Sequence, residues 1–102
     1  MEETKALMMG KVVLVRDHHA GIHVGTLVGL DVAAKCATLT NARKVHYWTG
    51  AASCHGIAAR GIKEGSRVAP SVDAVVSCDV VEVVLCSEAG ATSVLNFAEW
   101  RP

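Results

Sequence analysis

The stretch "KVVLVRDHHAGIHVGTLVGL" at residues 11–30 decides the predicted fold. Its first six residues are rich in β-branched side chains, which favour strands. The "DHHAG" segment that follows contains residues typical of turns, and residues 22–30 have the length and composition of a returning strand. The stretch therefore predicts a β-hairpin.

Further β segments are predicted at residues 36–40, 43–48, 72–77 and 80–86, and residues 63–71 read as a loop. Four of the resulting strands lie in the first half of the chain and are separated by short reversals. This order indicates a mostly antiparallel sheet.

Two helices are predicted beside this sheet. Residues 51–62 place small and apolar side chains at helical spacing, with Thr49 or Ser53 as N-cap and Gly61 or Gly65 to end the helix. Ser87 followed by Glu88 predicts a short C-terminal helix, because the hydroxyl caps free amides and the carboxylate meets the helix dipole. The expected fold class is α+β, with a mostly antiparallel β-sheet, a central helix and a short C-terminal helix.

Length and composition limit the possible classes of protein. A chain of 102 residues has the size of one domain, so residues 1–102 are expected to form a single domain. The formal net charge is zero, which leaves no long-range field to attract polymeric nucleic acid or an anionic membrane. Hydrophobic residues make up 51% of the chain. Because subunit interfaces resemble a domain core cut in half, this composition favours a homo-oligomer.

The N-terminal residues predict a cytosolic protein. Glu2 and Glu3 stand where a signal peptide has basic residues, and no apolar run approaches the roughly 18 residues that span a bilayer.

The four cysteines form no CxxC pair, so they do not begin a zinc or dithiol motif. Reduced and mostly buried thiols are the prediction. Two alternatives stay open: a disulfide between Cys78 and Cys86, and a mixed zinc site that uses His18, His19 or His55. No metal and no cofactor are expected.

No catalytic constellation is visible in the sequence. Ser53 or Cys54 would need a base beside it, but neighbours along a helix, such as Cys54 and His55, point about 100° apart. No GxSxG, HExxH, Walker or GxGxxG motif is present, and the acidic residues are scattered. The chain is therefore predicted not to be an enzyme.

The segment "NARKVHYWTGAASCHG" at residues 41–56 concentrates cations and aromatic rings. Strand alternation would place Arg43, Val45 and Tyr47 on one face. It would place Lys44, His46 and Trp48 on the other. Each face then carries a cation and a ring, which favours a ligand or a second subunit on one of them. Planar arginine matches phosphate and an aromatic ring can stack a base, so a small-anion site is one interpretation. The other interpretation needs no ligand: Tyr47 lies in the core, Trp48 is partly buried at its rim, and Arg43 forms a surface ion pair.

His23 also has two interpretations, a ligand contact or a core residue. It shares a strand face with Gly25, which opens space beside the imidazole and marks a bulge or a close backbone approach. A satisfied core histidine and a ligand contact are both compatible with this position.

Several segments resemble the first described family of phage Thoeris anti-defence proteins. These segments are "VRDHHAGIHVGTL" at 15–27, "TNARKVHYWTGAASCHGIAARGI" at 40–62 and "VVEVVLCSEAGA" before a terminal Trp. Positions that match the family pattern are Val15, Arg16, Ala20, Gly21, His23, Gly25, Ala42, Arg43, Val45, Tyr47, Trp48, Gly50 and Ala51. Lys44 and His46 depart from it, since the family has a second Arg and a Trp there.

This resemblance implies sequestration without chemistry. Family members bind glycocyclic ADP-ribose, the second messenger of Thoeris defence, and some hexameric members also trap cyclic di- and trinucleotides of CBASS defence. For this chain it implies a nucleotide-binding homo-oligomer, dimer or hexamer, in the cytoplasm of an infected bacterial host. Neither a membrane nor polymeric nucleic acid is an expected partner.

The residues expected to contact the messenger follow from their type and their location in the chain. They are Arg16, His23, Asn41, Arg43, Tyr47, Trp48 and Arg101. Arg43 is expected to contact phosphate or ribose, Tyr47 or Trp48 to stack a base, and Arg101 to reach over from a neighbouring subunit. The alternative function is a structural or interaction protein of a phage with no small-molecule ligand.

Overall fold

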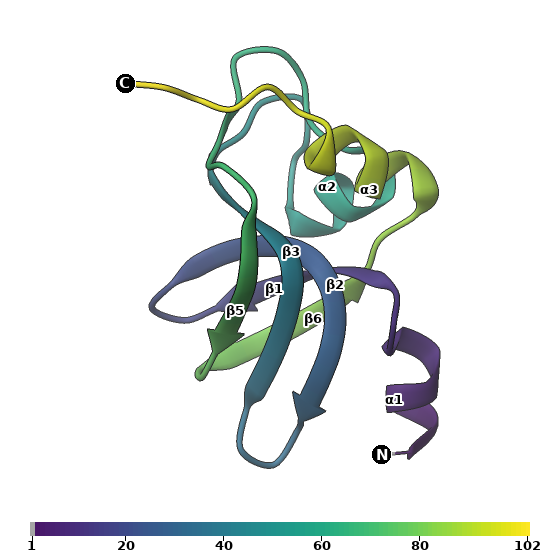
Figure 1. The fold of residues 1–102 in the computed structure, drawn as a ribbon. Helices are drawn as coiled ribbons and strands as arrows, with labels where there is room; N and C mark the ends of the chain where they lie inside the picture. Colours follow the sequence, from purple (N-terminus) through teal and green to yellow (C-terminus); the bar gives the residue numbers. More distant parts are fainter. Residues whose placement is uncertain (1) are drawn as a thin grey trace.

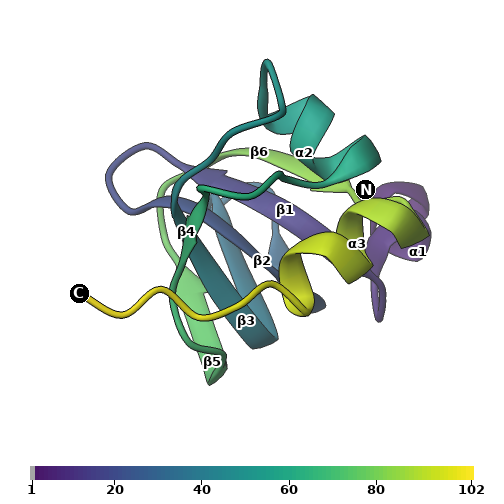
Figure 2. The ribbon, with the colours of Figure 1, turned by 90° about the horizontal axis from the view of Figure 1, so that it is seen from above.

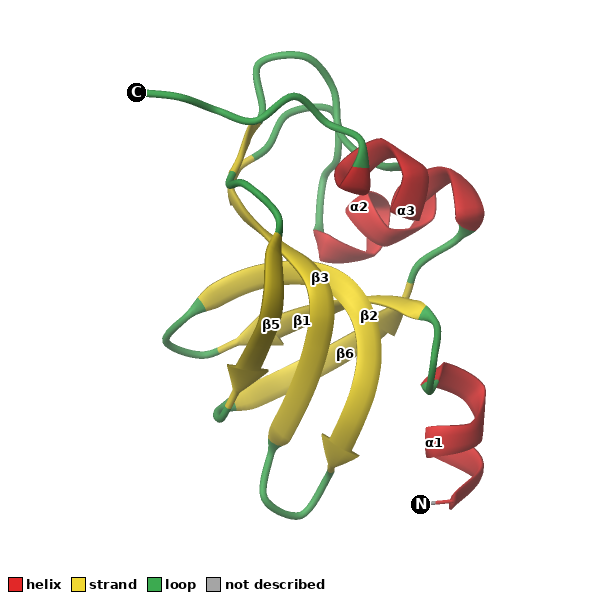
Figure 3. Cartoon of the chain, viewed as in Figure 1, coloured by secondary structure: helices red, strands yellow, loops and turns green. Residues whose placement is uncertain are grey.

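A computed structural model describes residues 2–102 of the chain and shows an α+β fold (Figures 1 and 3). The strands form one mostly antiparallel sheet of order β4-β3-β2-β1-β6, and β5 pairs with a second part of β3. Among the described residues, no helix is both long and apolar enough to cross a membrane. The elements in chain order are α1 (Glu2–Met8), β1 (Val12–Asp17), β2 (Gly21–Asp31), β3 (Cys36–Tyr47), α2 (Cys54–Arg60), β4 (Arg67–Val68), β5 (Val72–Ser77), β6 (Val80–Leu85) and α3 (Glu88–Leu95).

The predicted hairpin is confirmed by the pairing of β1 with β2, in a register that sets Arg16 opposite Ile22. The helix caps are confirmed as well. Ser53 caps α2 through its side chain, Gly61 ends that helix with a positive φ, and Ser87 caps α3. Two elements were not predicted: α1, and the short β4 within the segment expected to be a loop.

β3 is one strand of 12 residues, whereas the sequence predicted two shorter strands on either side of Asn41. A register shift against β2 absorbs the interruption, because Val24 pairs with Arg43 while Thr26 pairs with Thr40. Asn41 takes a positive φ of 50° at this bulge, a conformation that asparagine tolerates better than most residues. The bulge therefore bends β3 without ending it.

Gly25 makes the close approach that its place in the strand predicted. A Cβ added there would lie 3.0 Å from the Cα of Ala42 and from the carbonyl oxygen of Thr40. A side chain at this position would push β2 and β3 apart beside the bulge.

Two apolar cores lie on the two faces of the central strands. On one face, α2 and α3 cover the sheet, so that Leu14 and Val24 pack with Ile57 and Val94 (Figures 1 and 2). On the other face the sheet curls over itself, so that its two ends, β5 and β6, both contribute valines to a core around Val13, Val15, Leu27, Ala37, Leu39 and Ala42. Because β1 is covered on both faces, its residues form the continuous apolar run seen in the sequence.

The C-terminal tail returns to the sheet after α3. Glu99 bridges to Val68 of β4 in parallel, and the Trp100 amide donates to the Val68 carbonyl at 2.9 Å. Figure 2 shows the tail running past β4 on its way to the C-terminus. This pairing brings Trp100 beside the end of β3.

Candidate functional site

A second bulge of β3 lies between Val45 and Tyr47 and changes the face on which Tyr47 lies. Val45 pairs with Val68 but Tyr47 pairs with Arg67, so the register shifts between them. The prediction that Arg43, Val45 and Tyr47 share one face is therefore wrong at Tyr47. That side chain is 54% exposed, whereas Trp48 packs against the same core as Val45. Two adjacent aromatic residues thus belong to two different surfaces.

Trp48 lies in a pocket of about 370 Å³ between the end of β1, β6 and the start of α2. Its indole is held in place, because it packs on the apolar core between the sheet and helices α2 and α3, called the helix-side core below, and its Nε1 donates to the Ala51 carbonyl at 3.2 Å. The complete lining is Arg16, Trp48, Ser53, Cys54, His55 and Glu82. Of the seven predicted contact residues, the structure brings Arg16 and Trp48 together here.

Three charged or titratable side chains in the pocket are joined through Glu82. Arg16 Nε donates to Glu82 Oε1 at 3.3 Å, and His55 Nε2 lies 2.9 Å from Glu82 Oε2. The bond to His55, followed by that to Arg16, lowers the pKa of Glu82. Among the described residues, no side chain or carbonyl accepts from the two Nη groups of Arg16. Those groups are therefore free to meet an anion.

The Cys54 thiol is not an activated nucleophile. Burial raises its pKa, which keeps it protonated near neutral pH. Cys54 and His55 are adjacent in the sequence, which by itself is weak evidence for a catalytic pair. Both residues do line the pocket, but no hydrogen bond joins them among the described residues.

Arg43 is buried, with 5% of its surface exposed. Its Nε donates to the Ala69 carbonyl at 2.8 Å, and its Nη1 donates to the carbonyls of Val94, Leu95 and Phe97. These acceptors lie at the C-terminal end of α3 and in the segments beside it, where a cation is favoured by the helix dipole. Burial lowers the pKa of Arg43, but the ordinary arginine pKa is high enough to keep it charged. Arg43 thus holds the tail on the sheet, and these bonds account for its burial without a ligand.

His23 and Asn41 lie apart from the pocket. His23 is 9% exposed, and its Nδ1 has no hydrogen-bond partner among the described residues. Burial, with a smaller effect of Lys44, lowers the pKa of His23, so the ring is neutral at pH 7. Asn41 stands at the bulge of β3, and its Oδ1 accepts from the Ser71 hydroxyl at 2.9 Å.

A second aromatic surface lies where the tail meets β4. The guanidinium of Arg67 is 5.7 Å from the centroid of the Tyr47 ring and 5.1 Å from that of the Trp100 ring. Arg101 is nearby in the chain, but its Nε pairs with Glu99 at 3.0 Å. This surface, Tyr47 with Arg67 and Trp100, is exposed and is separate from the pocket lining.

The cysteines and histidines do not form the zinc site that the sequence left open, within residues 2–102. The one group there with metal-ligand spacing is Asp17, His19 and Asp79. Oδ1 of Asp17 already accepts from the His19 and Ala20 amides at 2.9 Å, and Oδ2 accepts from the Asp79 amide at 3.1 Å. These bonds lower the pKa of Asp17 to about 2. Asp17 therefore serves to hold two turns together.

Comparison with known proteins places the chain in a family. A family model described as a domain of unknown function, DUF6948, matches residues 10–94. The chain belongs to the DUF6948 family. All six pocket residues of this DUF6948 chain lie inside the matched region, whereas Trp100 and Arg101 of the tail lie outside it. No curated protein and no solved structure matches the chain.

Sequence reasoning missed Glu82 in the pocket and Arg67 at the tail surface. Glu82 could have been found, because a single carboxylate stands inside the apolar strand "VVEVVL" and would need a cationic partner there. Arg67 gave no such signal, since its contact with the rings depends on the second bulge and on the return of the tail.

Proposed function

We propose that the protein binds and sequesters a nucleotide second messenger of bacterial defence, without cleaving it. Glycocyclic ADP-ribose is the first candidate, and cyclic di- and trinucleotides are the second. The observation that carries the proposal is the convergence of Arg16, His55 and Trp48 on one pocket of about 370 Å³. That volume falls in the range of small-molecule sites, and these residue types suit phosphate and a base.

Each part of such a ligand has a matching group. The free Nη groups of Arg16 would meet a phosphate in the bidentate geometry that arginine favours. The Trp48 ring, fixed by its bond to Ala51, offers a surface for a base with little entropy left to lose. Glu82 would accept from ribose hydroxyls and keeps Arg16 and His55 oriented before the ligand arrives.

A hydrolase acting on the messenger is the second candidate function, because His55 and Glu82 form a pair of the kind that could activate a water molecule. Two features favour sequestration instead. The Cys54 thiol stays protonated, and Glu82 shares its carboxylate with Arg16, so it does not serve His55 alone as it would in a catalytic pair.

The same proposal includes a homo-oligomer in the cytoplasm of an infected host. Exposed valines on β5 and β6 support the oligomer, since Val72, Val76 and Val81 are 45%, 61% and 48% exposed. Val72 and Val76 lie on the same strand, and exposed apolar side chains that gather on one surface mark an interaction site in many soluble proteins.

The first test incubates the purified protein with a panel of glycocyclic ADP-ribose isomers and cyclic di- and trinucleotides. The protein is retained by filtration, and the retained material is then heated and identified by mass spectrometry. Sequestration predicts depletion of a ligand from the filtrate and its release in unchanged form. Release of a cleaved product supports the hydrolase, and no depletion across the panel overturns the proposal.

Two variants tie the result to the pocket. Arg16→Ala is expected to reduce depletion clearly when the protein concentration is close to the dissociation constant of the wild type, while Arg60→Ala is the matched control. Arg60 is an exposed arginine in the last turn of α2 and does not line the pocket. Equal depletion by the two variants would show that the ligand binds outside this pocket.

A further inference from the structure

The register of β3 with β5 sets two cysteines opposite each other. Ala37 pairs with Ser77 and Thr38 with Val76, so one further step along the antiparallel register faces Cys36 with Cys78. Directly opposed residues in antiparallel strands have Cα atoms about 4.5 or 5.5 Å apart, depending on the type of pair. Both values lie within the range of about 4.4 to 6.8 Å that a disulfide bridges.

The Val80 amide donates to the Lys35 carbonyl at 3.0 Å, which holds the turn after Cys78 against the residue that precedes Cys36. Burial raises the pKa of Cys36, and the nearby thiol of Cys78 adds to this effect. All four cysteines are free in this structure, with Cys78 exposed and Cys36 half-buried. A soluble oxidant can therefore reach Cys78, with Cys36 next to it.

The turn that carries Cys78 is held in position. The Asp79 amide donates to Asp17 Oδ2 at 3.1 Å, and the His18 amide donates to the Asp79 carbonyl at 2.9 Å. On the other strand, the Cys36 thiol lies 3.5 Å from the Ala34 carbonyl. The pair is thus fixed from both sides before any bond forms.

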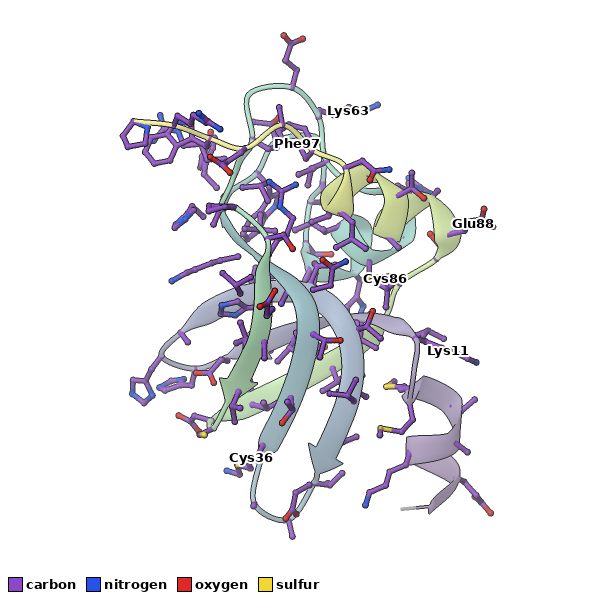
Figure 4. All side chains as sticks on the ribbon, in the orientation of Figure 1. Lys11, Cys36, Lys63, Cys86, Glu88 and Phe97 are labelled. Carbon is purple, nitrogen blue, oxygen red and sulfur yellow. The ribbon has the colours of Figure 1, made fainter. Side chains whose placement is uncertain are left out.

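The other two cysteines do not compete for this bond. Cys86 follows β6 at the end opposite to the turn of Cys78, and Figure 4 shows Cys36 and Cys86 at opposite ends of the sheet. Cys54 and Cys86 both pack against the helix-side core, and burial raises the pKa of Cys86 to about 11. The disulfide between Cys78 and Cys86 that the sequence left open is not compatible with these positions.

We propose that Cys36 and Cys78 form a reversible cross-strand disulfide that fastens the end of β5 to β3. With oxidised glutathione, the Cys78 thiolate attacks the glutathione disulfide, which forms a mixed disulfide and releases one glutathione. The Cys36 thiolate then attacks the Cys78 sulfur and releases the second glutathione. The protein loses two electrons and two protons, and one glutathione disulfide becomes two glutathione thiols. This modification site is independent of the messenger pocket.

The test exposes the full chain to buffers with a rising ratio of oxidised to reduced glutathione, quenches with acid and alkylates the remaining thiols. Trypsin cleaves after Lys35 and Arg43, and a Glu-specific protease cleaves after Glu82, which separates Cys78 from Cys86. The expected product is one linked pair of peptides containing Cys36 and Cys78. Cys54 and Cys86 are expected to be alkylated in the same sample.

Cys36→Ser is the diagnostic variant, and it should keep a glutathione adduct on Cys78 because the second thiol is missing. Cys86→Ala is the matched control and should keep the linked peptides. Oxidised wild type is expected to unfold about 5 °C or more above the reduced protein, and Cys36→Ser should show no such rise. The wild-type result is sufficient to overturn the proposal, whether or not the variants fold. It does so if the link goes to Cys86, if it forms only between two chains, or if no link forms under excess oxidised glutathione.

Discussion

Five charged or titratable residues of this protein form two regions with different kinds of partner. Arg43 and Asp17 are buried, and the bonds that hold them go to main-chain groups. Arg16, His55 and Glu82 line an open pocket and bond only to one another among the described residues. Main-chain partners are fixed by the fold, whereas side-chain partners in a pocket can exchange for a ligand. The first region is therefore expected to contribute mainly to stability, and the proposed function makes the second the recognition region.

The largest expected effect is on stability, from Arg43→Ala. This change removes the donor shared by several carbonyls at the end of α3 and in the tail, and it leaves those acceptors without a partner. A buried charged donor with this many acceptors predicts a loss of about 3 kcal/mol in the free energy of unfolding. Denaturant unfolding measures the loss.

Arg16→Ala is the control for that measurement, because it removes an arginine of the pocket region and is expected to change the free energy of unfolding by less than about 0.5 kcal/mol. Equal losses in the two variants would end the distinction between the two regions.

The second effect concerns Asp17 and depends on pH. The amides of His19, Ala20 and Asp79 hold the pKa of Asp17 at about 2 in the folded protein, below its ordinary 3.8. A lowered folded pKa gives stability that is complete above about pH 4 and is lost as the pH falls toward 2.

Asp17→Asn should therefore be less stable than wild type at pH 6, by about 1 kcal/mol, and this difference should shrink as the pH falls. Denaturant unfolding at a series of pH values gives the comparison. A difference that stays constant down to pH 2 would show that the charge of Asp17 does not contribute.

The third effect is on binding, from Arg16→Ala. With a messenger identified by the depletion test, the dissociation constant should rise by about tenfold or more, because a phosphate would lose its bidentate partner. Isothermal titration calorimetry measures this change, and Arg60→Ala should bind like wild type. A tenfold loss in Arg16→Ala beside unchanged stability is the signature expected of the pocket region.

Much of the fold could be predicted from the sequence, because local signals determine it. The hairpin at residues 11–30, the caps at Ser53 and Ser87 and the strand at Val72–Ser77 each follow from a few neighbouring residues. The candidate site was less predictable. Two bulges in β3 change which face a side chain occupies, and bulges depend on pairing with strands distant in sequence. Strand alternation alone could not show that Arg43 meets α3 or that Tyr47 leaves the core.

The smallest expected effect, from Tyr47→Ala, tests whether the tail surface belongs to the recognition region. Tyr47 is exposed and contacts Arg67, but it does not line the pocket, so its loss should change the dissociation constant by less than about threefold. The free energy of unfolding should change by less than about 0.5 kcal/mol, since exposed substitutions rarely do more. The same calorimetric titration measures the first quantity, with Arg16→Ala run in parallel. If Tyr47→Ala weakened binding as much as Arg16→Ala, the ligand would have to reach both surfaces. In that case recognition would extend from the pocket, past the second bulge of β3, to the rings held by Arg67.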